Sequence, residues 1–124
     1  MQHNNIISLG VSNATGAISA HLRVEIDSNG QAVIGGATNA FLGTNLQDVD
    51  GTVASDGAVG RNISAVQLKG CGLHYATADG AIAVGAEVDP VAAGKITTTA
   101  GSPCGRAVEA ASADGDVIRV VFYN

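Results

Sequence analysis

Asn-Gly and Asp-Gly dipeptides interrupt this chain along its whole length and restrict it to short elements of structure. Asn and Asp tolerate a positive φ and Gly has no Cβ, so these pairs favour tight hairpin turns. Glycine accounts for 17 of the 124 residues, which weakens any long helix. The dipeptides are Asn29-Gly30, Asp50-Gly51, Asp56-Gly57, Asp79-Gly80 and Asp114-Gly115.

The segments between these turns have the composition of β-strands. Residues 22–26 alternate apolar and charged side chains, as a strand with one buried face does. Residues 32–34 follow the Asn29-Gly30 turn and complete a predicted hairpin. Further strands are predicted at residues 63–68, 72–76 and 117–123. We therefore expect a single all-β domain, either a sandwich or a small barrel.

Signals for helix are sparse. Residues 107–113 are rich in Ala, but Gly105 and Asp114-Gly115 bound them, so at most two helical turns fit. A strand that runs into a turn is the alternative for this segment. Residues 39–46 are predicted to include a short turn or helix.

The two halves of the chain resemble each other when they are overlaid. Ile18, Val24 and Gly30 recur 64 residues later as Ile82, Val88 and Gly94. Residues 43–47 resemble 105–109, and residues 63–68 resemble 117–122. The overlay predicts two pseudo-repeated strand units, which would pack into a pseudo-symmetric β-barrel. Coincidence in a chain rich in Val, Ala and Gly is the alternative.

Two segments stand outside this repeat. Residues 1–12 are interpreted as an extended N-terminal arm, ahead of a single β domain at 13–124. The arm alternates polar and apolar residues near its end and could add a strand to the sheet edge of a partner. Its alternatives are the first strand of the domain itself and a frayed terminus. Residues 48–61 lengthen the first unit and are predicted to form a surface loop.

Composition limits the classes of partner. The net charge is −5 and the basic residues are scattered, which argues against nucleic-acid binding. No apolar run approaches the ~20 residues that span a bilayer, and the polar start of the chain lacks the features of a secretory signal. We therefore expect no membrane contact and synthesis in a cytoplasm. Only 14% of residues are charged, which is typical of a surface that self-associates or docks on a partner.

The sequence contains no motif for catalysis, phosphate binding or dinucleotide binding. Cys71 and His74 form the one local pair with catalytic potential, but residues three apart on a strand point to opposite faces. Cys71, His74 and Cys104 lack standard zinc spacing and a fourth ligand. The two cysteines are expected to be reduced core residues, with a single disulfide as the alternative. We expect no enzyme activity, no catalytic residue, no cofactor and no metal.

A family resemblance lies in the Gly-led segments of the second half and in its terminal β run. The segments are residues 85–88, 94–98, 105–111, 115–118 and the strand up to Tyr123. They resemble the C-terminal part of capsid decoration proteins of tailed bacteriophages, also called cement or head-stabilising proteins. The first half, from Ile18 through Gly43 to Leu68, resembles the same family more loosely.

The resemblance implies a small β-barrel or β-tulip-like domain on the outer capsid surface of the virion, after assembly in the host cytoplasm. It implies a homotrimer that binds the expanded phage head and stabilises it by bridging major capsid protein subunits. By position alone, the arm would supply the capsid-binding residues Gln2, His3, Asn4, Asn5, Ile6, Ile7, Ser8, Leu9 and Val11. The alternatives are another virion β module, such as a tail or fibre component, and a host- or glycan-binding domain of the virion surface.

Overall fold

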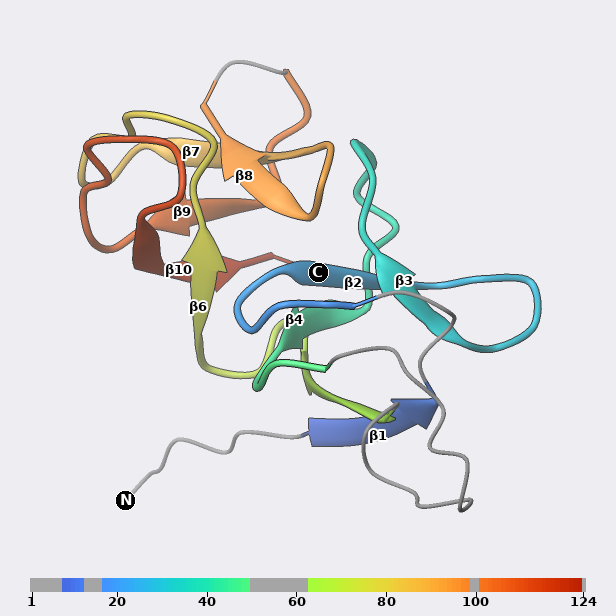
Figure 1. Cartoon of the computed structure of the whole chain (residues 1–124). Helices are drawn as coiled ribbons and strands as arrows, with labels where there is room; N and C mark the ends of the chain where they lie inside the picture. Colours follow the sequence, from blue (N-terminus) through green and yellow to red (C-terminus); the bar gives the residue numbers. More distant parts are fainter. Residues whose placement is uncertain (1–7, 13–16, 50–62, 99–100, 124) are drawn as a thin grey trace, which may run out of the picture.

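A computed structural model describes residues 8–12, 17–49, 63–98 and 101–123, and this part of the chain is all-β, as the sequence predicted (Figure 1). It contains ten strands and no helix. The strands are β1 (Ser8–Ser12), β2 (Arg23–Ile26), β3 (Ala32–Ile34), β4 (Gly43–Asn45), β5 (Ile63–Leu68), β6 (Leu73–Thr77), β7 (Glu87–Val91), β8 (Lys95–Thr97), β9 (Gly105–Ala107) and β10 (Val117–Phe122).

The strands form two antiparallel sheets of five strands each. The first sheet has the order β1-β5-β4-β2-β3, and the second has the order β6-β10-β9-β7-β8. Adding five to every strand number converts the first order into the second. The two halves of the chain therefore share one topology, and Figure 1 shows them as two neighbouring groups of strands.

Strand pairing is equivalent in the two sheets at the level of single residues. Val24 pairs with Gly43 in the first sheet, and Val88 pairs with Gly105 in the second. The isolated bridges outside the strands are equivalent too, namely Ile18 with Val49 and Ile82 with Ala111. Apart from Val49 and Ala111, these residues are the ones that the sequence overlay matched, so the strand pairing follows the predicted repeat.

Glycine begins the central strand of each sheet because the neighbouring backbone leaves no room for a side chain. A Cβ on Gly43 would lie 1.9 Å from the Gln67 carbonyl oxygen, and a Cβ on Gly105 would lie 2.3 Å from that of Val121. Both distances are far below contact distance. Gln67 and Val121 occupy equivalent positions in β5 and β10, so the same close approach occurs in both sheets.

Each half buries its own apolar cluster on one face of its sheet. In β10 the exposed and buried residues alternate strictly, and its buried Ile118, Val120 and Phe122 belong to the larger cluster. The cluster of the first half is smaller and is built on Ile18, Val24, Ala32 and Val66. One residue of the first half, Phe41, belongs to the cluster of the second. The two cores are thus joined by an aromatic side chain.

The edges of the second sheet approach each other at one point. Ala78, one residue beyond β6, forms a parallel bridge to Ile96 in β8, and the Asp79 amide donates to the Ile96 carbonyl at 2.8 Å. In the first sheet, β1 and β3 are the edge strands of the described part.

Several element boundaries differ from the sequence prediction. Residues 39–46 contain β4 instead of a helix. Residues 107–113 hold the end of β9, a bend and the bridge residue Ala111, which is closer to the strand alternative than to a helix. The predicted strands at 32–34 and 63–68 are observed with the same limits. Most of the predicted 48–61 loop lies outside the described residues, but Asp48 accepts a hydrogen bond from the Ala20 amide at 2.7 Å.

Candidate functional site

Polar and aromatic side chains join the two halves at a buried junction. Thr44 of β4 and His74 of β6 are hydrogen-bonded at 2.7 Å between Oγ1 and Nδ1, and both residues are buried. The ring of Phe122 packs edge-on against Phe41 and against His74, with centroids 5.0 Å apart in each case. The junction therefore combines one hydrogen bond with a continuous aromatic contact.

Arg23 lies in this junction, and no carboxylate among the described residues forms an ion pair with it. Its Nε donates to the Lys95 carbonyl at 3.0 Å, and its Nη2 donates to the carbonyls of Gly36, at 2.9 Å, and of Val91. Its guanidinium carbon lies 5.0 Å from the centroid of the Phe41 ring, a cation–π contact. Burial lowers the pKa of Arg23 from its ordinary value, and nearby Cys104 and Glu25 oppose that shift.

Burial keeps two titratable groups of the junction, His74 and Cys104, uncharged at neutral pH. Burial lowers the pKa of His74 to about 4, and the nearby Leu68 backbone opposes the shift. Burial also raises the pKa of the Cys104 thiol to about 11. A thiol with that pKa is protonated at neutral pH and is a poor nucleophile. Cys71 and Cys104 are both free, and Cys71 is only partly buried.

No group of three or more His, Cys, Asp or Glu side chains in the described ranges is arranged to hold a metal ion. His74, which the sequence placed beside Cys71 and Cys104 as a nominal ligand, instead contacts Thr44 and Phe122. The chemistry of the junction is therefore structural: it links the halves through hydrogen bonds and aromatic packing.

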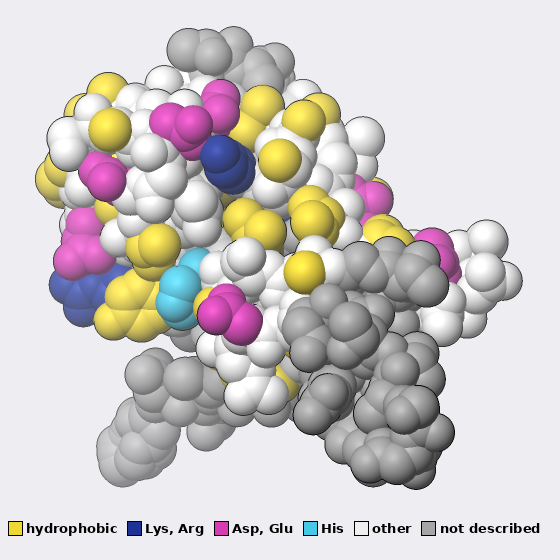
Figure 2. Space-filling view, viewed as in Figure 1, with side chains coloured by type: hydrophobic (Ala, Val, Ile, Leu, Met, Phe, Trp, Pro, Cys, Tyr) yellow, Lys and Arg dark blue, Asp and Glu magenta, His cyan; other side chains and the backbone are white. Residues whose placement is uncertain are grey.

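An exposed apolar surface lies on the opposite side of the second sheet from its core. We call it the second-sheet outer surface. Leu73 is directly opposite Val121 across β6 and β10, and Tyr75 is opposite Arg119, so the four side chains share one face. Hydrophobic side chains gather beside a histidine and basic side chains at the lower left of Figure 2. The surface comprises Leu73, Tyr75, Glu87, Arg106, Val108, Val117, Arg119 and Val121.

The charges on this surface are paired within the chain. Arg119 contacts Glu109 at 3.2 Å, and Arg106 contacts Glu87 at 3.9 Å. The backbone amide and the guanidinium of Arg119 donate to Glu109 and lower the pKa of that carboxyl. Paired charges leave the apolar residues as the feature that distinguishes this surface.

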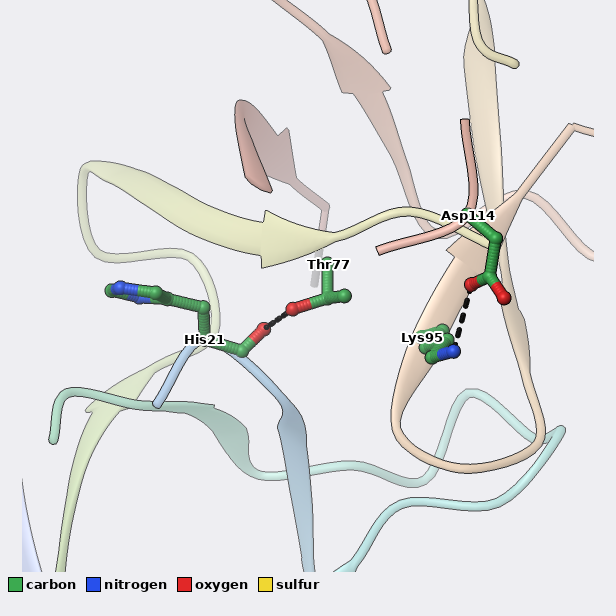
Figure 3. Close-up of polar contacts among 4 residues, drawn as sticks. All are labelled: His21, Thr77, Lys95 and Asp114. Atoms are coloured by element: carbon green, nitrogen blue, oxygen red, sulfur yellow. Dashed lines mark hydrogen bonds and ion pairs between the residues drawn. The ribbon is translucent and has the colours of Figure 1, made fainter. Parts of the chain in front are cut away.

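Figure 3 shows two polar contacts, and the one between Thr77 and His21 joins the two halves. The Thr77 hydroxyl donates to the His21 carbonyl at 3.2 Å, and the His21 ring lies 5.4 Å from that of Tyr75. His21 has a positive φ of 69°, whereas its equivalent in the second half is Gly85 at 81°. The ammonium of Lys95 contacts Asp114 at 2.7 Å, which raises the pKa of Lys95.

The candidate capsid-binding residues fall in two places. Ser8, Leu9 and Val11 belong to β1, whose five residues pair with β5 at the edge of the first sheet. Residues 2–7 (Gln2, His3, Asn4, Asn5, Ile6 and Ile7) lie outside the described residues. The structure thus joins the end of the predicted arm to the first sheet.

Sequence reasoning did not identify the second-sheet outer surface. Residues 117–123 are apolar at nearly every position, so the pattern predicted a strand without revealing which face would be exposed. The sequence contained a weak signal for this surface, because residues 117–123 hold more apolar residues than one buried face of a strand requires.

No known family model matches the chain, and the search of curated proteins found no match. Among the described residues, no helix is both long and apolar enough to cross a membrane.

Proposed function

We propose that the chain is a capsid decoration protein that binds the outer surface of an expanded phage head and bridges major capsid protein subunits as a homotrimer. The proposal starts from the family resemblance of the second half. The observation that carries it further is the position of β1: an edge strand, paired on one side with β5, that continues directly from the N-terminal segment. An edge strand offers unpaired backbone groups to a partner strand.

The remaining surfaces suit a protein that acts by adhesion. Decoration requires a stiff domain with docking surfaces and needs no catalytic group. The buried junction between the halves supplies stiffness, and the second-sheet outer surface supplies an apolar contact area. Several weak contacts per homotrimer would add up through multivalency.

We also infer that each half closes into a small barrel of the β-tulip type. The inference is supported by the bridge between Ala78 and Ile96, which brings the two edges of the second sheet together. The equivalent of Ile96 in the first half is Ala32, and the matching partner falls at residues 13–16, outside the described residues.

Capsid binding is tested by deleting residues 1–7, which leaves β1 intact. Co-sedimentation with expanded and unexpanded shells measures binding. We expect the full chain to bind expanded shells selectively and the truncated chain to bind them at least tenfold more weakly, because the arm would no longer add a strand.

A matched pair of variants tests whether binding requires the apolar side chains of the arm. Ile6→Ser with Ile7→Ser removes two apolar side chains of the arm, whereas Asn39→Ser changes an exposed polar residue outside the arm. We expect only the first variant to weaken binding. Unchanged binding after truncation would refute the arm as the contact, and binding to neither shell would favour a tail or fibre component or a glycan-binding domain.

A further inference from the structure

Equivalent positions in the two sheets have opposite environments. In the first sheet Arg23, Thr44 and Gln67 form one row across β2, β4 and β5, and all three are buried. The equivalent row in the second sheet is Glu87, Arg106 and Val121, and all of these are exposed. Val121, for example, is 42% exposed. One face is therefore covered in one half and open in the other.

The second half itself covers the row in the first sheet. Gln67 donates from Nε2 to the carbonyls of Cys71 and Leu73, at 2.7 and 2.9 Å. Thr44 bonds His74, and Arg23 reaches the carbonyls of the β7–β8 hairpin. The outer face of the first sheet thus packs against one end of the second sheet's core.

The residues at that end of the second core are buried, whereas their equivalents in the first half are exposed or only partly buried. Pro90, Cys104 and Phe122 are buried where the first half packs against them. Their equivalents form what we call the open end of the first sheet: Ile26 is 42% exposed, and Leu42 and Leu68 are only partly buried. The contact between the halves has two sides, the outer face of the first sheet and one end of the second sheet's core. The chain carries an equivalent of each side that no residue in the described part of the chain covers.

We propose that the second-sheet outer surface of one chain binds the open end of the first sheet of a second copy. The contact repeats, between chains, the packing that joins the two halves within a chain. This contact names the surfaces that would join the subunits of the proposed homotrimer. A head-to-tail contact closes into a ring when the rotation between subunits allows it, and the number of three copies rests on the proposed function.

Position and size are consistent with this contact. The β2–β3 hairpin, which carries Ile26 of the open end, projects away from β6, β9 and β10 (Figure 1). The five apolar residues of the outer surface are each 39–52% exposed, so they can supply part of the ~800 Å² that each partner contributes to a standard interface. The paired charges of Arg106 and Arg119 can form the polar rim.

Two charge substitutions, one on each surface, test the proposal in the full chain. Val121→Glu lies at the centre of the outer surface and Ile26→Glu lies at the open end. Leu46→Glu is the control, since Leu46 is similarly exposed, at 39%, and belongs to neither surface. Analytical ultracentrifugation gives the mass of each protein and of an equimolar mixture of the two variants, and circular dichroism checks their folding.

We expect the unmodified chain and Leu46→Glu to sediment at a multiple of 12.2 kDa, and each surface variant at 12.2 kDa. The mixture should form a dimer of twice that mass, because each variant keeps the surface that the other has lost. A monomeric unmodified chain would overturn the proposal. Dissociation caused by Val121→Glu but not by Ile26→Glu would also overturn it, because that result would indicate a symmetric contact between two outer surfaces. A mixture of the two variants that stays monomeric would overturn it as well. Capsid binding is measured separately, so either proposal can fail while the other stands.

Discussion

His74 is the residue whose ionisation the fold controls most strongly. It is fully buried, it is hydrogen-bonded to Thr44, and its Nε2 has no partner within the described part of the chain. Protonation would place a charge in a buried environment, beside the Phe122 ring. The folded state therefore keeps His74 neutral, as its pKa of about 4 indicates.

Acid should destabilise the protein through this histidine. The unfolded chain binds the proton near pH 6.5, whereas the folded chain resists it until about pH 4. The stability that the protein gains from keeping His74 neutral is therefore fully present above pH 6.5. It falls as the pH drops toward 4 and then levels off. It amounts to about 3 kcal/mol of unfolding free energy. Urea unfolding at several pH values between 7.5 and 4 measures the loss.

The double variant His74→Leu with Thr44→Val is the control for that titration. Leu9 stands at the position equivalent to His74, so Leu suits this register, and removing both hydrogen-bond partners leaves no lone buried polar group. We expect its stability to lose most of this pH dependence, and what remains near pH 4 to come from carboxyls such as Glu109, whose pKa the fold lowers. An unchanged pH dependence would assign the effect to another group.

At the scale of the strands, close backbone contact decides where β4 and β9 lie. Both strands are three residues long and begin with glycine, and both lie between longer strands. Their sequences, Gly-Thr-Asn and Gly-Arg-Ala, have little intrinsic preference for strand. The approach of β5 and β10 to these glycines holds them in place.

Gly43→Ala and Gly105→Ala should each lower the free energy of unfolding by about 3 kcal/mol or more, because the added methyl group must displace a backbone carbonyl. Gly80→Ala is the matched control, since nothing lies within 4 Å of its added Cβ and its φ is not positive. Chemical denaturation measures all three. Equal stability of the three variants would contradict the close approach.

The whole molecule depends on Arg23, because this residue of the first half binds carbonyl oxygens of the second. The carbonyls of Lys95 and Val91 would lose this donor if the guanidinium were removed, and both hydrogen bonds are partly buried. Each buried acceptor left without a donor costs about 1–3 kcal/mol. The contact between the halves is therefore the most vulnerable part of the fold.

Arg23→Met should destabilise the protein by roughly 3 kcal/mol or more and loosen the contact between the halves. Arg119→Met, which removes an exposed arginine from a surface ion pair, should cost less than about 1 kcal/mol. Thermal unfolding followed by circular dichroism compares the two. If they lost stability equally, the buried hydrogen bonds of Arg23 would not be what joins the halves.

Much of the fold could be predicted from local patterns. Turn dipeptides and alternation identified β2, β3 and β5, and the 64-residue offset identified the repeat. β4 and β9 were missed because packing rather than propensity forms them. Of the candidate site, the arm was proposed from its alternation, and its last residues are in β1. The second-sheet outer surface was missed because β10 is apolar on both faces.

The sequence by itself determined where several of the strands and turns occur and that the chain repeats. Only the tertiary structure decided which of two equivalent rows is buried. The polar row of Arg23, Thr44 and Gln67 is enclosed, while the row containing Val121 faces solvent, the reverse of what polarity predicts. The physical reason is that burial here follows the packing of one half on the other. Backbone carbonyls and His74 from the second half satisfy the enclosed polar groups, and no local pattern contains those partners.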